Sequence, residues 1–492
     1  DNVLARASAR WVPTETFTFN LAFDYTDGRS NGAPITHGGV LPSGLFLTLF
    51  NQLVAPMQGI AAPNGQPTYN ASFAPADPLT NHSTASVRNT LETWGVTATA
   101  EWSLGAATIR SISAYRDLDT TFNRDGDASP FTFRENRVHD MAEQFSQEFQ
   151  FTGALFQERL KWLLGGYYFN EKGLGALELN LASGVFAALE ALPGPLPNGF
   201  GGRGNPRNIS LDNDVTASND VRNETYAAFT DVSFDVTDWL TLEAGLRQNW
   251  DDKEFSPVLL KIASNVYIAP PGSRFAASFT SFTPRFAVQV KPAEAILLYG
   301  SYAKGFKSGG FNGRPLTSIA EINQFEPEEV ASYELGVKSE WFDRRLVINA
   351  AAFTSDYTNI QLLVVQPPAN FVYNAGAGRI RGVEIETNAR LFGALTFNGS
   401  LGYLDAEYSE VGQNVAPGQS VPITLSSKFI KTPKWTWSAG GQYDIGLASS
   451  GTLSLRADYS HKSGYFNDVS NSPQIYQPGF GLLSARASYT TP

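Results

Sequence analysis

The sequence of 492 residues contains no cysteine and only two methionines. The lack of cysteine excludes disulfide bonds, thiol chemistry and cysteine-ligated metal sites. Charged residues make up 17% of the chain, well below the ~25% that is usual in soluble domains. The net charge is −11, so the chain lacks the basic surface that a nucleic-acid-binding protein needs.

Long hydrophobic runs are missing as well. No stretch of about 18 consecutive apolar residues is present, which excludes a transmembrane helix. The start at Asp1 also lacks the charged-then-apolar pattern of a signal peptide. The mean hydropathy of −0.19 is polar. A transmembrane β-barrel has an average of this kind, because only alternate residues of its strands face lipid.

Aromatic residues (13%) and glycines (44 residues) are plentiful instead. Strand-like segments recur in pairs joined by short turns, and longer loops separate the pairs. The pattern predicts seventeen strands: 3–11 and 16–25, 91–102 and 107–118, 143–152 and 160–170, 224–235 and 239–250, 278–290 and 295–304, 330–341 and 344–357, 379–390 and 394–408, 434–445 and 452–462, and a single strand at 481–490.

Several of these segments alternate cleanly between apolar and polar residues. In 239–250, Leu240, Leu242 and Leu246 fall on one side of the strand, whereas Glu243 and Arg247 fall on the other. A period of two indicates a strand with one apolar face, and charges on the second face suit a wet lumen. A soluble β-sandwich is the alternative, but its strands average only about five to six residues.

We therefore predict an all-β fold, an antiparallel transmembrane β-barrel with short periplasmic turns and long extracellular loops. On that rule strands 3–11 and 481–490 both run towards the periplasm. An antiparallel sheet whose first and last strands run in the same direction cannot close on itself. We therefore expect residues 1–492 to form one incomplete barrel domain.

Residues 295–357 and the segment that follows carry a family resemblance. The motifs are Tyr299-Gly-Ser-Tyr-Ala-Lys-Gly-Phe-Lys-Ser-Gly-Gly-Phe-Asn312, Phe325-Glu-Pro-Glu328, Tyr333-Glu-Leu-Gly-Val-Lys338, Asn374 and Gly382-Val-Glu384-Ile-Glu386. They resemble the barrel of a TonB-dependent outer-membrane receptor, especially the subgroup common in sphingomonad- and caulobacter-like bacteria. The likeness is close over 280–408 and loose over most of the chain.

This resemblance implies a plugged barrel of about 22 strands. On that count the chain supplies roughly the fourth to the twentieth strand, and no plug or TonB-binding box is found in it. The resemblance further implies uptake of a ferric siderophore, a corrinoid, or a carbohydrate or aromatic compound by a single barrel in the outer membrane. It implies that lipopolysaccharide and membrane lipid surround the barrel, and that TonB is a partner that acts through a plug. No cofactor is expected. The alternative function is a passive pore or a structural barrel.

Cations and aromatic residues gather around the two glycine-rich loops of the motif region. Arginine and lysine there would suit an anionic, partly aromatic ligand held in an outer vestibule. The alternative is that these cations contact lipopolysaccharide or pair with nearby acids. The candidate ligand-binding residues are Lys304, Phe306, Lys307, Phe311, Asn312, Arg314, Tyr373, Arg379 and Arg381.

Two loops contain apolar segments with helical spacing, Ser43–Met57 and Ala182–Leu192. Each would be either a lid over a hydrophobic ligand or a helix packed within the loops, and packing is favoured. The stretch Gly199-Phe-Gly-Gly-Arg-Gly204 resembles a phosphate loop, but it lacks the strand and helix that such a loop requires.

Nothing in the sequence indicates catalysis or a metal centre. The four histidines are scattered, and no GxSxG or HExxH motif is present. Two acidic groups would provide calcium ligands at a loop base, although solvated loop charge is favoured for both. They are Asp251 with Asp252 and Glu254, and Asp212 with Asp214. We expect a protein that is not an enzyme.

Overall fold

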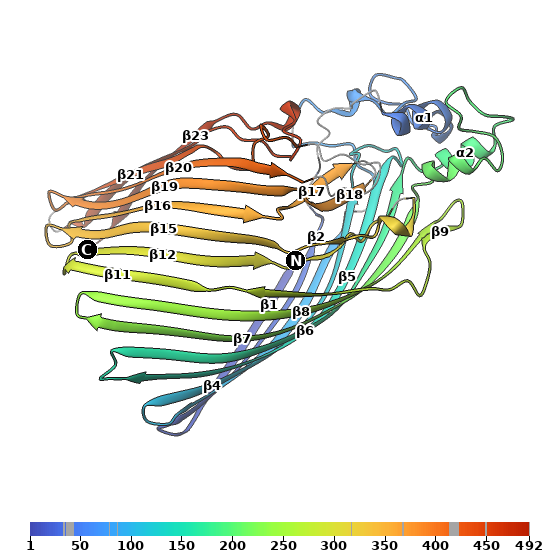
Figure 1. Ribbon diagram of the computed structural model, residues 1–492. Helices are drawn as coiled ribbons and strands as arrows, with labels where there is room; N and C mark the ends of the chain where they lie inside the picture. The colour runs from blue at the N-terminus through green and yellow to red at the C-terminus, as the bar shows by residue number, and fades with distance from the viewer. Residues whose placement is uncertain are drawn as a thin grey trace.

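The computed structural model of residues 1–492 is a strongly curved antiparallel β-sheet with loops and short helices gathered at one end (Figure 1). It describes every residue except 33–34, 36–43, 78, 86, 316, 367–368, 413–422, 448–449 and 492. Among the described residues, no helix has the length and apolar character needed to cross a membrane.

Nineteen strands form the main sheet. Their bounds are β1 Asn2–Thr14, β2 Phe17–Ser30, β3 Asn89–Ser103, β4 Ala107–Asp125, β5 Arg134–Leu155, β6 Leu160–Leu181, β7 Val215–Thr237, β8 Leu240–Lys261, β9 Val266–Ala269, β10 Phe275–Phe282, β11 Arg285–Ala293, β12 Ile296–Lys307, β15 Glu328–Trp341, β16 Leu346–Thr358, β19 Gly376–Leu391, β20 Leu395–Val411, β21 Trp435–Gly446, β22 Thr452–Lys462 and β23 Phe480–Thr490. The loops add two helices and two small hairpins: α1 Leu45–Leu53, α2 Val185–Glu190, β13 Gly310–Phe311 with β14 Gln324–Phe325, and β17 Gln361–Gln366 with β18 Ala369–Asn374.

The predicted strand 278–290 is divided in the structure, and this corrects the prediction. β10 pairs with β8 up to Phe282, and β11 resumes the same ladder at Arg285. Pro284 lies between them and has no backbone N–H to contribute to a ladder. Since β10 and β11 occupy one position along β8, and the short β9 pairs only with the far end of β8, the described sheet has the seventeen positions that the sequence predicts.

The central strands are longer than predicted. β5, β6 and β8 have 22 residues each and β7 has 23, whereas the sequence pattern predicts strands of ten to twelve residues there. The outer-face pattern ends early because the apolar residues change to the inner face at the extracellular ends of these strands, where Leu177, Ala217 and Leu259 lie in register and pack in one cluster. The hydrogen-bonded strands therefore extend beyond the alternating segments on the extracellular side. Several side chains lie on strands where the sequence pattern predicts loops.

The sheet is open at its first and last strands. β1 pairs with β2, and β23 pairs with β22. Within the described ranges, no pairing joins β1 to β23. Both strands run from the loop end towards the end with short turns, so they run parallel to each other, as expected from the strand count.

Strand alternation separates an apolar outer face from a polar inner face. Aromatic residues form ring contacts on the outer face, for example Tyr302 with the exposed Tyr333 and Tyr403 with the exposed Trp435. Bands of aromatic residues mark the membrane interface of outer-membrane barrels. On the inner face, Glu243 accepts hydrogen bonds from Arg285 (2.9 Å) and Gln289 (2.6 Å). This polar lining fits a water-filled interior.

Position 336 in β15 needs a glycine because the ring of Tyr299 covers it on the inner face. A Cβ atom at this position would fall on the ring of Tyr299, whose hydroxyl donates a hydrogen bond to Glu334 (2.6 Å). We expect Gly336→Ala to displace the ring and destabilise the barrel by about 1–3 kcal/mol, the usual cost of overpacking. The melting temperature, read from the heat-dependent gel mobility of the folded barrel, would fall. Gly441→Ala is the control, since a Cβ there has nothing within 4 Å; equal effects of the two changes would contradict the argument.

Candidate functional site

The candidate ligand residues divide between the two faces of the sheet. On β12, Lys304 and Phe306 share the face of Tyr302. This is the outer face, because Tyr302 lies opposite Tyr333, which is 52% exposed. Lys304 forms an ion pair there with Glu329 (2.9 Å). The structure therefore places these two side chains outside the lumen, and their part in ligand binding stays a prediction. The physical reason for the placement is register: a strand residue and its second neighbour point to the same side.

Arg379 and Arg381 on β19 also lie on the outer face. They share it with Val383 and Ile385, which are 42% and 37% exposed. Arg379 forms an ion pair with Asp356 of the neighbouring strand. Register thus places both arginines outside the lumen, where the alternative of surface cations also puts them, and their part in ligand binding stays a prediction.

Lys307, by contrast, lies on the inner face at the extracellular end of β12, where it borders a cavity of about 530 Å³. Phe311 of β13 lines the same cavity, and its ring stacks on Phe255 at 6.1 Å with an interplanar angle of 12°. Of the nine predicted residues, these two line the cavity. Its lining is Val221, Asn223, Lys253, Glu254, Phe255, Lys307, Ser308, Gly309, Gly310, Phe311, Phe325, Gln361, Leu363 and Val372.

The cavity combines aromatic walls with polar groups. The ammonium of Lys253 donates to the carbonyl oxygen of Gly309 (2.7 Å), and Asn223 donates to Glu171 (2.7 Å). The hydroxyl of Ser308 is buried, with no hydrogen-bond partner among the described residues. Leu363 is 54% exposed. A ligand with an aromatic or apolar part and a polar or anionic edge matches such a lining.

Asn312 and Tyr373 are structural residues of the loops around this cavity. Asn312 is 5% exposed, and its side-chain amide binds both the N–H and the C=O of Val372 (2.7 and 2.9 Å). Tyr373 is 1% exposed within an apolar cluster that includes Phe371 and Tyr408, and burial raises the pKa of its phenol. Neither side chain reaches the cavity, because each is committed to packing β18 against the adjacent loop.

Replacing Asn312 with alanine should loosen this packing. The change leaves two part-buried backbone groups of Val372 without these partners, and a fully buried group left unpaired costs about 1–3 kcal/mol. We expect faster hydrogen exchange in β17 and β18, measured by mass spectrometry. Arg314→Ala is the matched control, because Arg314 is exposed and no described residue pairs with it. Unchanged exchange in the Asn312 variant would contradict this role.

Several cavity residues are absent from the sequence prediction. Lys253 and Phe255 lie beyond position 250, where the predicted strand ends, yet β8 continues to Lys261. No apolar alternation marked this continuation, because residues 247–254 are polar on both faces apart from Trp250. The side-chain amide of Gln361 donates hydrogen bonds to the carbonyl oxygens of Ser308 and Glu326 (both 3.0 Å). These contacts join segments that are distant in the sequence, so no local pattern predicts them.

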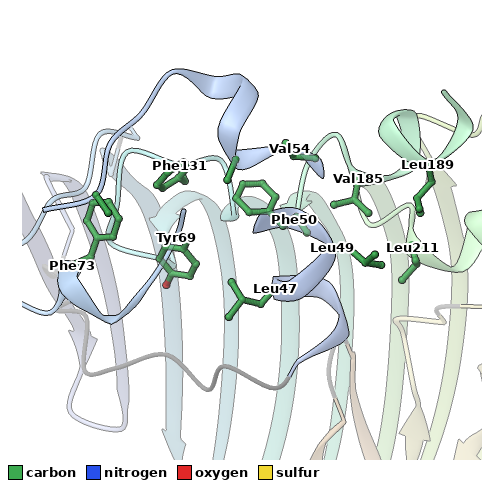
Figure 2. Close-up of a cluster of buried hydrophobic side chains, with 13 residues drawn as sticks. Leu47, Leu49, Phe50, Val54, Tyr69, Phe73, Phe131, Val185, Leu189 and Leu211 are labelled. Carbon is green, nitrogen blue, oxygen red and sulfur yellow. The ribbon is translucent and has the colours of Figure 1, made fainter. Parts of the chain in front are cut away.

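The apolar helices form a loop cap, defined as α1, α2 and the buried residues packed with them (Figure 2). Phe50 of α1 and Val185 and Leu189 of α2 are fully buried. Packing within the loops, the favoured interpretation, is what the structure shows for both helices. The buried residues of the loop cap are Leu47, Leu49, Phe50, Val54, Ala55, Ala62, Tyr69, Phe73, Phe131, Ala182, Val185, Leu189 and Leu211.

The remaining polar candidates have internal partners. The N–H of Gly204 in the glycine-rich stretch donates to the carboxylate of Glu190 (2.7 Å), so an internal anion occupies the position of a phosphate. Asp251 accepts a hydrogen bond from Thr225 (2.7 Å), and Asp212 accepts one from the N–H of Ser264 (2.7 Å). Across the part of the chain that the structure describes, no group of three or more histidine or acidic residues is arranged to hold a metal ion.

Comparison with known proteins gives one family. Residues 16–492 match the model of "TonB dependent receptor-like, beta-barrel". The chain is 26% identical over 258 residues to the probable TonB-dependent siderophore receptor PiuA of Acinetobacter baumannii, covering 51% of this chain and 32% of that protein. It is 30% identical over 165 residues to the metal-pseudopaline receptor CntO of Pseudomonas aeruginosa, covering 33% of this chain and 21% of that protein.

Solved structures share the fold at low identity. The ferric yersiniabactin uptake receptor FyuA of Yersinia pestis superposes with a TM-score of 0.71 at 14% identity, covering 100% of this chain and 63% of that one. The siderophore receptor PiuA of A. baumannii superposes with a TM-score of 0.67 at 17% identity, covering 99% of this chain and 68% of that one. The match to the curated relatives thus spans a third of their length or less. These relatives give no support to the narrower sphingomonad and caulobacter likeness.

Proposed function

The chain belongs to the TonB dependent receptor-like β-barrel family, and from that premise we propose that it forms the wall and outer binding surface of a receptor that imports a scarce nutrient. The family consists of outer-membrane transporters, so the chain is not an enzyme. The observation that carries the proposal is the cavity beside Lys307 and Phe311 at the extracellular end of the inner face. The cavity lies at the end of the sheet where the loops gather, which is the side that faces an external ligand.

The ligand class that we propose is an anionic metal chelate with aromatic or apolar parts, such as a ferric siderophore. The stacked rings of Phe255 and Phe311 supply an apolar wall, and Lys307 supplies a positive charge at its edge. The similarity to PiuA, CntO and FyuA, which are receptors for siderophores or metal chelates, supports this choice. A corrinoid, carbohydrate or aromatic nutrient is the next candidate.

We further propose that translocation is driven by TonB through a plug inside the barrel. Residues 16–492 match the barrel of this family, and plugged outer-membrane transporters have barrels of about 22 strands. The polar inner face would then contact the plug. In this account the barrel binds and encloses the ligand, and a pull on the plug opens the path.

A passive pore or structural barrel is the second candidate, because an unplugged barrel of this size leaves an aqueous channel. Planar-bilayer recordings of the full-length protein distinguish the two. The receptor proposal predicts a closed barrel with no steady current, together with saturable binding of a ferric chelate measured by quenching of intrinsic tryptophan fluorescence. Large, steady currents without saturable binding would favour the pore.

A further inference from the structure

Lys253 joins the wall of the barrel to residues 308–312, a segment that borders the cavity and that we call the strap. Lys253 lies on the inner face of β8, in the same alternating series as Glu243 and Phe255. Its ammonium donates a hydrogen bond to the carbonyl oxygen of Gly309 in the strap (2.7 Å). Both residues of this contact line the cavity, so a ligand in the cavity would lie beside it.

This contact is the polar link between the wall and the strap. Within the described chain, no other hydrogen bond joins the strap to strands β6 to β10. The strap is also attached to the β17–β18 hairpin, since Gln361 donates to the carbonyl oxygen of Ser308 (3.0 Å) and Asn312 bonds the backbone of Val372. The strap and this hairpin thus form one hydrogen-bonded unit, which Lys253 ties to the wall.

The ammonium of Lys253 lacks a charged partner. Among the described residues it forms no ion pair, although the charges of Glu171 and Asp251 act on it. Glu171 accepts hydrogen bonds from two side-chain amides (2.8 and 2.7 Å), and Asp251 accepts one from the hydroxyl of Thr225 (2.7 Å). A half-buried cation is usually matched by an anion, so the neutral carbonyl of Gly309 leaves the charge of Lys253 available.

The other charged groups at the cavity do not neutralise Lys253. Glu254 forms an ion pair with Arg274 (2.6 Å). Glu328 lies opposite Lys307 in the ladder, but it accepts a hydrogen bond from the first backbone N–H of β17 (2.6 Å) and does not line the cavity. The lining therefore presents the ammonium groups of Lys253 and Lys307 together with one carboxylate that is already paired.

We propose that Lys253 is a second cation of the ligand site and a latch on the strap. An anionic oxygen of the ligand takes the ammonium from the carbonyl of Gly309, and the strap with the β17–β18 hairpin is then released from the wall. A full negative charge attracts the ammonium more strongly than the partial charge of a carbonyl oxygen does. The latch rests on the proposed function, because the anionic oxygen belongs to the imported chelate. Occupancy of the cavity would thus be coupled to the position of the extracellular loops.

The test measures hydrogen exchange of the strap by mass spectrometry, on full-length protein in detergent, with ferric citrate and a ferric tris-catecholate as anionic chelates. Binding of either chelate to the wild type should raise strap exchange about tenfold, because a hydrogen bond from a charged group is lost. Lys253→Met keeps the length of the side chain and removes its charge. This variant should show raised exchange in the ligand-free protein and no further rise with chelate.

Lys307→Met is the matched control, because Lys307 lines the same cavity but donates no hydrogen bond to the strap in the described chain. It should weaken chelate binding, measured by tryptophan quenching, and leave strap exchange of the ligand-free protein unchanged. Heat-dependent gel mobility confirms that each variant is folded.

Two results would overturn the latch and leave the proposed function standing. One is saturable quenching of the wild type with strap exchange unchanged or lowered. The other is equal strap exchange in the ligand-free wild type and in Lys253→Met. Absence of saturable quenching with both chelates would instead count against the proposed function, and release of the strap by a ligand would be overturned with it.

Discussion

Replacing Phe50 with alanine is expected to destabilise the loop cap by about 3–5 kcal/mol, the usual cost of removing a buried phenylalanine side chain. The Phe50 side chain is fully buried, and its ring contacts Phe131 at 6.1 Å and Phe133 at 5.2 Å. These contacts join the loop after β2 to the loop after β4. The variant should expose residues 45–73 to protease and raise their hydrogen exchange, while the strands stay protected.

Leu45→Ala provides the control for this result, because Leu45 begins the same helix but is 41% exposed. It should change the protection of the loop cap only slightly. Equal protease sensitivity in the two variants would contradict the view that the loop cap has a packed core of its own. Loss of the folded barrel in the Phe50 variant would also contradict it, since the sheet does not depend on α1 for its hydrogen bonds.

Removing the charge of Lys307 is expected to have the largest effect on ligand binding. Lys307→Gln should weaken the affinity for an anionic ferric chelate by about 10- to 100-fold, because hydrogen bonds to charged groups contribute about 1.5–3 kcal/mol. Lys304→Gln is the matched control: the same change, three positions earlier on the same strand, on the outer face. Binding is measured by tryptophan fluorescence quenching with the ferric chelate of highest affinity.

The pair is decisive because the two lysines differ mainly in the face that they occupy. A loss of affinity confined to Lys307→Gln would place the ligand inside the barrel mouth. Equal losses in both variants would indicate a general electrostatic effect, and no loss in either would remove the cavity from the binding account.

The sequence was sufficient to predict the sheet but only part of the site. Seventeen strand positions follow from alternation and turn spacing, because both are local properties. The vestibule prediction grouped Lys304 with Lys307 and added Arg379 and Arg381. Counting from Tyr302 on the outer face would have separated the two lysines, since Lys304 lies two residues along the same face and Lys307 lies on the other.

Other parts of the site lay beyond local reasoning. Hydrogen bonds from Gln361 to Ser308 and from Asn312 to Val372 join loops that are about fifty or sixty residues apart in the chain. Such contacts depend on how the loops fold over the barrel mouth. Lys253 was missed for a simpler reason, because polar residues on both faces hid the continuation of β8.

The most direct test of the account is uptake of a ⁵⁵Fe-labelled ferric chelate by iron-limited cells that produce the full-length protein, with and without a functional TonB. The account predicts saturable uptake that requires both the receptor and TonB and that falls in the Lys307→Gln variant but not in the Lys304→Gln variant. Uptake that is non-saturable and equal without TonB would contradict it and would identify the protein as a passive pore.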